Sequence, residues 1–100
     1  LIYLIMKLID IKKSDREKKK YMAIFEDDEG KRKTTHFGLK GANDFTLTGD
    51  KEARKRYRER HKKDLDTNDP TRAGYLSYFI LWNKPTIKES IADYKKRFNL

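Results

Sequence analysis

The amino-acid sequence predicts an α+β fold in which a small three-stranded antiparallel meander precedes three helices. Between residues 7 and 38, short apolar runs rich in β-branched and aromatic residues alternate with charged or glycine-containing connections, as strands do. Between residues 50 and 98, apolar residues recur at helical spacing. A chain of 100 residues makes one domain. We therefore expect the sheet at 7–38 and the helical part at 50–98 to share one core.

The three strands are expected at residues 7–12, 21–26 and 33–38. The first is an apolar run interrupted by charges, and the second and third carry β-branched and aromatic residues. Gly30 lies in the acidic connection between the second and third strands, where a turn can use a positive φ. Connections this short join antiparallel neighbours, which predicts a meander.

The first helix is expected to run from residue 51 to about residue 65, after a loop over residues 38–49. Three glycines and an Asn-Asp pair predict turns in that loop. Asp50 is well placed to accept hydrogen bonds from the first turn of the helix as its N-cap.

Two further helices follow, at about residues 71–82 and from residue 87 to the end. Asp69 as cap with Pro70 in the first helical position predicts the start of the second helix. Thr86 and Glu89 are spaced as a capping box for the third. The stripes expected to face the core are Tyr75, Leu76, Phe79 and Ile80 on one helix, and Ile87, Ile91, Tyr94 and Phe98 on the other.

Charge dominates the composition. The net charge is +9, the isoelectric point is about 9.7, and 41% of the residues are charged. A chain of this kind is attracted to nucleic acid, acidic protein surfaces or anionic lipid. The alternative is that the cations only keep a small domain in solution. Twelve per cent aromatic residues argue against a disordered chain.

The composition also excludes several classes of function. The chain has no cysteine, which excludes disulfides and thiol chemistry. No apolar run approaches the roughly 20 residues needed to cross a membrane. The sequence opens with leucine, and Met6 is the first residue at which a natural protein could begin. Either Met6 is the natural start, with residues 1–5 an upstream extension, or the chain is a fragment of a longer protein.

The helix expected at 51–65 is the strongest candidate for a binding surface. Within residues 51–63 it carries eight Lys or Arg residues against Glu52 and Glu59. Its expected inner face is weak, with Ala53, Tyr57 and Leu65 beside His61. The five cations that share one side could meet a row of phosphates without reading base sequence, and they are Lys51, Arg54, Lys55, Arg58 and Lys62. The alternative is a solvated face.

Lys40 is a second candidate for anion binding. It lies between Gly38 and Gly41, so backbone amides and an ammonium group could face one anion. The Gly-Lys-Ser/Thr ending of a P-loop is missing, however. The alternative is a structural loop in which Asp44 and its neighbours hydrogen-bond the backbone.

No catalytic or metal-binding arrangement stands out. His36 and His61 lack the further ligands that a metal site needs. His36 could pair with Asp44, but no convincing nucleophile accompanies them. We therefore expect no catalytic residue, no metal, no cofactor and no small-molecule substrate. An enzyme such as a nuclease remains the least favoured class.

Aromatic residues are concentrated in the last 30 positions. They could stack on bases, but their helical spacing favours a core beneath the meander. Two of them, Tyr78 and Trp82, are expected at the edge of that core, where half-buried aromatics often anchor partners.

Four segments of the chain carry a likeness to known sequences. They are THFGLKGANDFT at 35–46, RYRERH at 56–61, DPTRAGYLS at 69–77 leading into ILWNKPTI at 80–87, and SIADYKKRF at 90–98. Together they resemble a family of short uncharacterised proteins encoded by giant (nucleocytoplasmic large) double-stranded DNA viruses. The likeness covers nearly everything from Met6 onward. It implies a viral origin and supports Met6 as the start, but it implies no activity and transfers no functional residue.

These observations favour a small basic viral protein that binds nucleic acid non-specifically through its phosphates, with DNA expected rather than RNA. The alternative is a minor capsid or scaffold protein that docks on acidic virion proteins. In both cases we expect the protein in the virion or in the viral factory of the host-cell cytoplasm.

Overall fold

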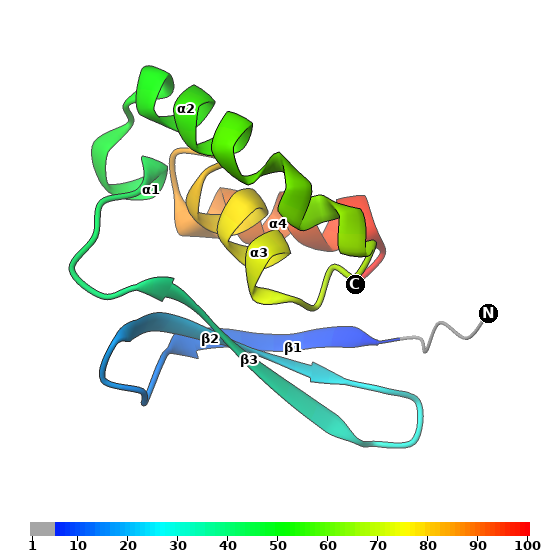
Figure 1. The fold of residues 1–100 in the computed structure, drawn as a ribbon. Helices are drawn as coiled ribbons and strands as arrows, with labels where there is room; N and C mark the ends of the chain where they lie inside the picture. Colours follow the sequence, from blue (N-terminus) through cyan, green and yellow to red (C-terminus); the bar gives the residue numbers. More distant parts are fainter. Residues whose placement is uncertain (1–5) are drawn as a thin grey trace.

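The computed structural model describes residues 6–100, and the question of an upstream extension at 1–5 lies outside them. It confirms the predicted α+β fold, with three antiparallel strands followed by helices (Figure 1). The elements in chain order are β1 (Lys7–Lys13), β2 (Lys19–Glu26), β3 (Arg32–Leu39), α1 (Phe45–Thr48), α2 (Lys51–His61), the 3-10 helix η1 (Lys62–Thr67), α3 (Ala73–Leu76), the π-helix η2 (Ser77–Leu81) and α4 (Ile87–Phe98).

The sheet is a meander in the order β1-β2-β3. Tyr21 lies opposite Phe37 in the β2–β3 register, and Ala23 lies opposite Thr35. Because side chains alternate across a strand, the buried residues of β2 and β3 fall on one face. Helices cover that face, and within residues 6–100 no helix covers the other (Figure 1).

The core forms between this face and the α3–η2–α4 helices. Tyr94 of α4 is fully buried, and its hydroxyl donates to the Pro70 carbonyl. Both the ring and the hydroxyl group of this residue therefore hold α4 in place. The predicted aromatic core is confirmed, with Tyr78 and Trp82 half-buried at its edge. The buried apolar cluster is Leu8, Ala23, Phe25, Phe37, Tyr75, Leu76, Phe79, Ile80, Leu81 and Tyr94.

Helix α2 lies furthest from the sheet (Figure 1). It rests on the other helices and has no fully buried residue of its own. The predicted cap is confirmed, because the Asp50 side chain accepts from the backbone N–H groups of Glu52 and Ala53 at 3.0 and 3.1 Å. A helix without a buried apolar stripe needs other attachments, and these define the candidate site described below.

Three predicted boundaries were wrong. The loop at 38–49 contains the one-turn helix α1, which Asp44 caps by accepting from the Thr46 backbone N–H at 2.9 Å. The α-helix from residue 51 ends at His61, and the chain continues as the 3-10 helix η1. The helix expected from residue 71 begins at Ala73, because Asp69 accepts both the backbone N–H and the hydroxyl of Thr71 in a local turn.

The last helix begins as predicted. The Thr86 side chain accepts from the Glu89 backbone N–H at 3.1 Å, which confirms the N-cap. No helix within residues 6–100 is both long and apolar enough to cross a membrane.

Candidate nucleic-acid interface

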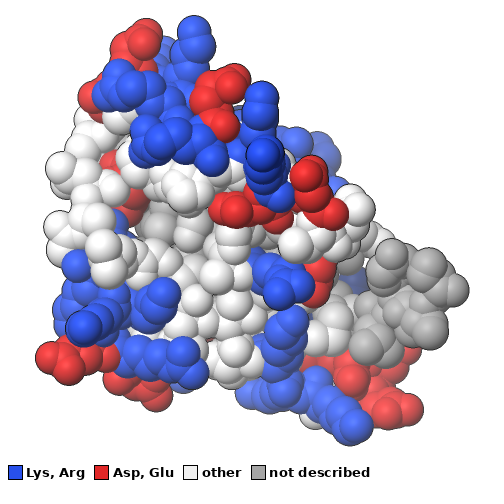
Figure 2. Space-filling view, viewed as in Figure 1, with Lys and Arg blue, Asp and Glu red and all other residues white. Residues whose placement is uncertain are grey.

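Lys and Arg side chains gather over α2, with a few acidic groups among them (Figure 2). Of the five cations predicted to share one side, Lys51, Lys55 and Lys62 are exposed. Lys62 lies 3.5 Å from Glu59 in an ion pair whose members are both about two-thirds exposed. Such a pair contributes little to stability, so the lysine can exchange its partner for a phosphate at small cost.

The other two members of the predicted row, Arg54 and Arg58, turn inward. Arg54 donates from Nη1 to the Asn83 carbonyl at 2.8 Å. Arg58 donates from Nε to the Trp82 carbonyl at 2.8 Å and from Nη2 to Asn83 Oδ1 at 3.1 Å. The expectation of one continuous solvent-facing row therefore needs correction: the row straddles the boundary between the exposed and the packed side of α2.

The two arginines have a clear structural reason to face inward. The carbonyls of Trp82 and Asn83 follow the C-terminal end of η2, where a helix leaves unpaired carbonyl groups and a partial negative charge. Guanidinium groups from α2 satisfy these carbonyls across the interface. The arginines also lie over rings, Arg54 at 4.3 Å from the Phe45 centroid and Arg58 at 4.5 Å from the Tyr78 centroid. Burial lowers the pKa of the Arg58 guanidinium below its usual value.

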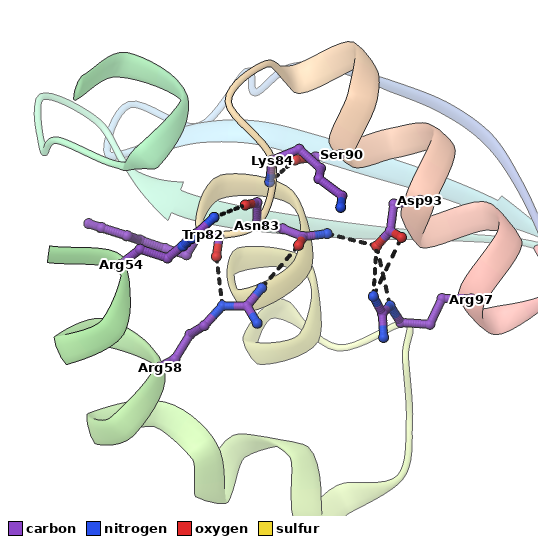
Figure 3. A network of polar contacts seen from close by, with 8 residues as sticks. All are labelled: Arg54, Arg58, Trp82, Asn83, Lys84, Ser90, Asp93 and Arg97. Carbon is purple, nitrogen blue, oxygen red and sulfur yellow. Dashed lines mark hydrogen bonds and ion pairs between the residues drawn. The ribbon is translucent and has the colours of Figure 1, made fainter. Parts of the chain in front are cut away.

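Asn83 joins α2 to α4 through this network (Figure 3). Its side chain is buried, and both of its polar ends are used. Oδ1 accepts from Arg58, while Nδ2 donates to Asp93 Oδ2 at 2.7 Å. Asp93 in turn accepts from the guanidinium of Arg97 on the same helix. The network therefore fixes the arginine positions from behind.

The Asp93 link should make stability depend on acid. Burial raises the pKa of Asp93, but hydrogen bonds from Asn83 and Arg97 outweigh it and leave the pKa below its ordinary value of 3.8. A carboxylate with a lowered folded-state pKa stabilises the fold above its unfolded pKa, and this contribution is lost as the pH falls through the folded value. We expect Asp93→Asn to lose less stability than the unchanged protein between about pH 5 and pH 2, measured by urea unfolding. Parallel pH profiles would contradict this.

A shallow pocket of about 570 Å³ opens beside the network. Four α2 cations line it together with the buried amide of Asn83, and two acidic groups of α2 line it as well. Arg54 uses one of its five N–H groups in the bond to Asn83, and Arg58 uses two in its bonds to Trp82 and Asn83. The pocket can therefore present further donors to an anion. Its lining is Lys51, Glu52, Arg54, Lys55, Arg58, Glu59 and Asn83.

A column of three stacked rings completes the attachment of α2. The Tyr57 and Trp82 rings are nearly parallel at 8°, with centroids 4.6 Å apart. His61 stacks on Tyr57 with a centroid separation of 4.1 Å. All three residues are half-buried. The expected inner face of α2 is thus confirmed at Tyr57 and His61, and the ring that this face contacts is that of Trp82.

Lys40, the sixth predicted residue, lies apart from the pocket lining. It is exposed after β3, and its backbone N–H donates to the Lys18 carbonyl at 2.9 Å. The neighbouring Gly38 and Gly41 both have a positive φ. Asp44 is buried and pairs with Lys20, with Nζ and Oδ2 2.5 Å apart. These bonds favour the structural alternative for the loop.

His36 does not pair with Asp44. Its Nδ1 lies 2.7 Å from Ser14 Oγ, and Asp15 Oδ1 lies 4.0 Å from its Nε2. The three residue types of a hydrolytic triad are therefore close together. The Asp15 side chain is 80% exposed, however, and Ser14 Oγ also accepts from the Arg16 N–H. We therefore interpret the Ser14–His36 contact as a structural one, which joins the β1–β2 connection to β3. Within residues 6–100 no cluster of three or more metal-ligating side chains occurs.

Sequence reasoning missed Asn83 and the Tyr57–Trp82 stack. Asn83 precedes Lys84-Pro85, so its place in the sequence indicates only the end of a helix. The sequence shows that Tyr57, His61 and Trp82 carry rings. Nothing in its spacing indicates that the Trp82 ring would stack on that of Tyr57, 25 residues away.

Comparison with known proteins identifies a family whose function is unknown. No curated protein and no solved structure matches the chain. Residues 9–61, just over half of the chain, match the model of a family of unknown function, DUF5754. The match begins within β1 and covers β2, β3, α1 and α2 through His61, and so includes five of the six predicted anion-binding residues, all except Lys62. The chain belongs to that family.

Proposed function

We propose that this protein binds nucleic acid non-specifically through its phosphates, with α2 as the contact. The observation that carries the proposal is the pocket in which four cations of one helix meet around Asn83. Two of them, Arg54 and Arg58, are held in place by carbonyl groups, so they lose little freedom when an anion binds. Exposed lysines beside them extend the cationic surface along the helix.

The chemistry of the surface suits a polyanion better than a small ligand. Arginine can grip phosphate oxygens with two N–H groups, and lysine adds a mobile point charge. Contacts of this kind carry no base information, so sequence-independent binding is expected. Glu52 and Glu59 also line the pocket, and their charges oppose a phosphate that approaches them.

We expect the combined Lys51→Gln, Lys55→Gln and Lys62→Gln variant to bind a short DNA duplex about tenfold or more weakly at roughly 0.1 M salt. Three fewer phosphate contacts should reduce the slope of log affinity against log salt by about 2–3. Fluorescence anisotropy across a salt series measures both quantities. The lysines are exposed, so the fold should be retained.

The control variant is Lys88→Gln, Lys95→Gln and Lys96→Gln. These lysines are exposed on α4, and the change in net charge is the same. It should keep most of the affinity and the slope. Equal losses in the two variants would mean that overall charge, rather than α2, attracts the nucleic acid, and the proposed contact would be wrong.

A second candidate function is docking on an acidic protein as a minor capsid or scaffold component. The observation that favours it is the exposure of two large apolar side chains, Leu39 at the end of β3 at 61% and Leu47 in α1 at 67%. An interface with an apolar centre would resist salt, whereas phosphate binding weakens steeply with it. The same salt series therefore distinguishes the two functions.

We place the action of the protein in a virion or viral factory as part of this proposal. The support is the resemblance to giant-virus proteins over segments that include RYRERH of α2. A large packaged genome supplies phosphates in excess, which suits non-specific binding. Detection of the chain in purified virions by mass spectrometry would test the location, and its absence there would exclude a virion component.

A further inference from the structure

We propose that the ring column of Tyr57, His61 and Trp82 is a stacking platform that makes the protein prefer single-stranded nucleic acid. This inference rests on the proposed function, because it assumes that α2 binds the phosphate backbone. It adds the form of the polymer: bases in a single strand can turn toward a protein ring, whereas those of a duplex are already stacked.

The geometry of the column resembles that of stacked bases. The centroids of the His61 and Tyr57 rings lie 4.1 Å apart at an interplanar angle of 23°, and those of Tyr57 and Trp82 lie 4.6 Å apart at 8°. His61 is the terminal ring, and its side chain is 40% exposed. Its Nδ1 lies 3.2 Å from Asp64 Oδ2, which helps to hold the plane of the ring. One more flat ring can therefore extend the column at its His61 end.

The column and the cationic pocket are parts of one surface. Tyr57 and His61 are one turn apart on α2, the helix that also supplies the pocket cations. Arg58, which lines the pocket, donates to the carbonyl of Trp82, the innermost ring. Lys62, immediately after His61, is 66% exposed. A strand whose phosphates follow the α2 lysines would thus carry its bases past the His61 ring.

The test uses strands that have equal numbers of phosphates but differ in their bases. Oligothymidylate and oligouridylate are compared with an abasic deoxyribose-phosphate strand of the same length, and with a duplex, by anisotropy at one salt concentration. Base–aromatic stacking predicts about tenfold tighter binding of at least one base-bearing strand than of the abasic strand. The two oligomers show whether DNA or RNA is preferred.

Variants at the exposed end of the column locate the effect. His61→Ala should bring the base-bearing and abasic affinities within about twofold, while His61→Phe, which keeps a ring but lacks the contact with Asp64, should retain the preference. Neither change removes a pocket cation. Far-UV circular dichroism verifies that both variants fold, and the comparison of strands with the unchanged protein does not depend on them.

The possible failures are distinguishable. Equal binding of thymidylate, uridylate and abasic strands by the unchanged protein would overturn the platform, as would a preference that survives in His61→Ala. Duplex binding that weakens steeply in the salt series described under the proposed function would then leave the proposed phosphate binding intact. If no strand and no duplex binds, both proposals are wrong.

Discussion

Gly38→Ala is expected to lower the free energy of unfolding by about 3–4 kcal/mol. Gly38 has a φ of +80°, which costs an L-residue about 1–2 kcal/mol. A Cβ at this position would also lie 2.9 Å from Leu81 Cδ1 and 3.2 Å from Lys20 Cβ. Leu81 is in the core, so the clash cannot be relieved by a movement into solvent. Urea unfolding monitored by circular dichroism measures the loss.

Gly41→Ala separates the two causes of this loss. Gly41 has a similar φ of +88°, but a Cβ there would meet nothing within 4 Å. We expect only the backbone cost, about 1–2 kcal/mol. Equal destabilisation by the two substitutions would show that the contact with Leu81 relaxes freely, and that β3 is not held against η2 as the structure indicates.

Arg58→Ala is expected to destabilise the protein by about 2–3 kcal/mol. The substitution removes both hydrogen bonds to the end of η2 and the cation–π contact with Tyr78. It also leaves the buried Oδ1 of Asn83 without its donor. Because α2 has no buried apolar residue to compensate, its docking should suffer most. Near-UV circular dichroism of Trp82 reports the docking, and urea unfolding reports the stability.

Two companion variants test this interpretation. Arg58→Lys keeps the charge but cannot form both bonds with a planar fork, so it should recover only part of the loss. Arg56→Ala removes an exposed arginine from the same helix and should change stability by no more than about 0.5 kcal/mol. If Arg58→Ala were as mild as Arg56→Ala, Arg58 would be a surface cation, as sequence reasoning expected.

Local signals in the sequence were sufficient for much of the fold. Short apolar runs rich in β-branched and aromatic residues predicted the strands. The caps at Asp50 and Thr86 placed two helix starts correctly because a side-chain acceptor acts within three residues. The start after Asp69 was wrong for a related reason. The same carboxylate can satisfy a turn instead of a helix, and the choice depends on tertiary packing that local spacing does not contain.

The candidate site was harder to predict than the fold. Charge counting identified α2, but it treated all of its cations as solvent-facing. Beside the C-terminal end of another helix, an arginine can bury the aliphatic part of its side chain and donate its N–H groups to the free carbonyls there. That helix end comes from Trp82 and Asn83, distant in sequence from Arg54 and Arg58. No periodicity within α2 could reveal this partner.

The π-helix η2 has a consequence for how this protein can vary. The Trp82 N–H donates to the Ser77 carbonyl five residues earlier, so one turn holds an additional residue compared with an α-helix. Loss of a single codon within residues 77–81 would restore an ordinary turn. Because the wide turn accommodates its additional residue locally, the segments before and after it would keep their relative rotation. The same deletion in an ordinary α-helix would rotate everything beyond it by about 100°. Trp82 and Asn83 should therefore still face α2, and this segment should tolerate the loss of one residue better than α2 or α4 would.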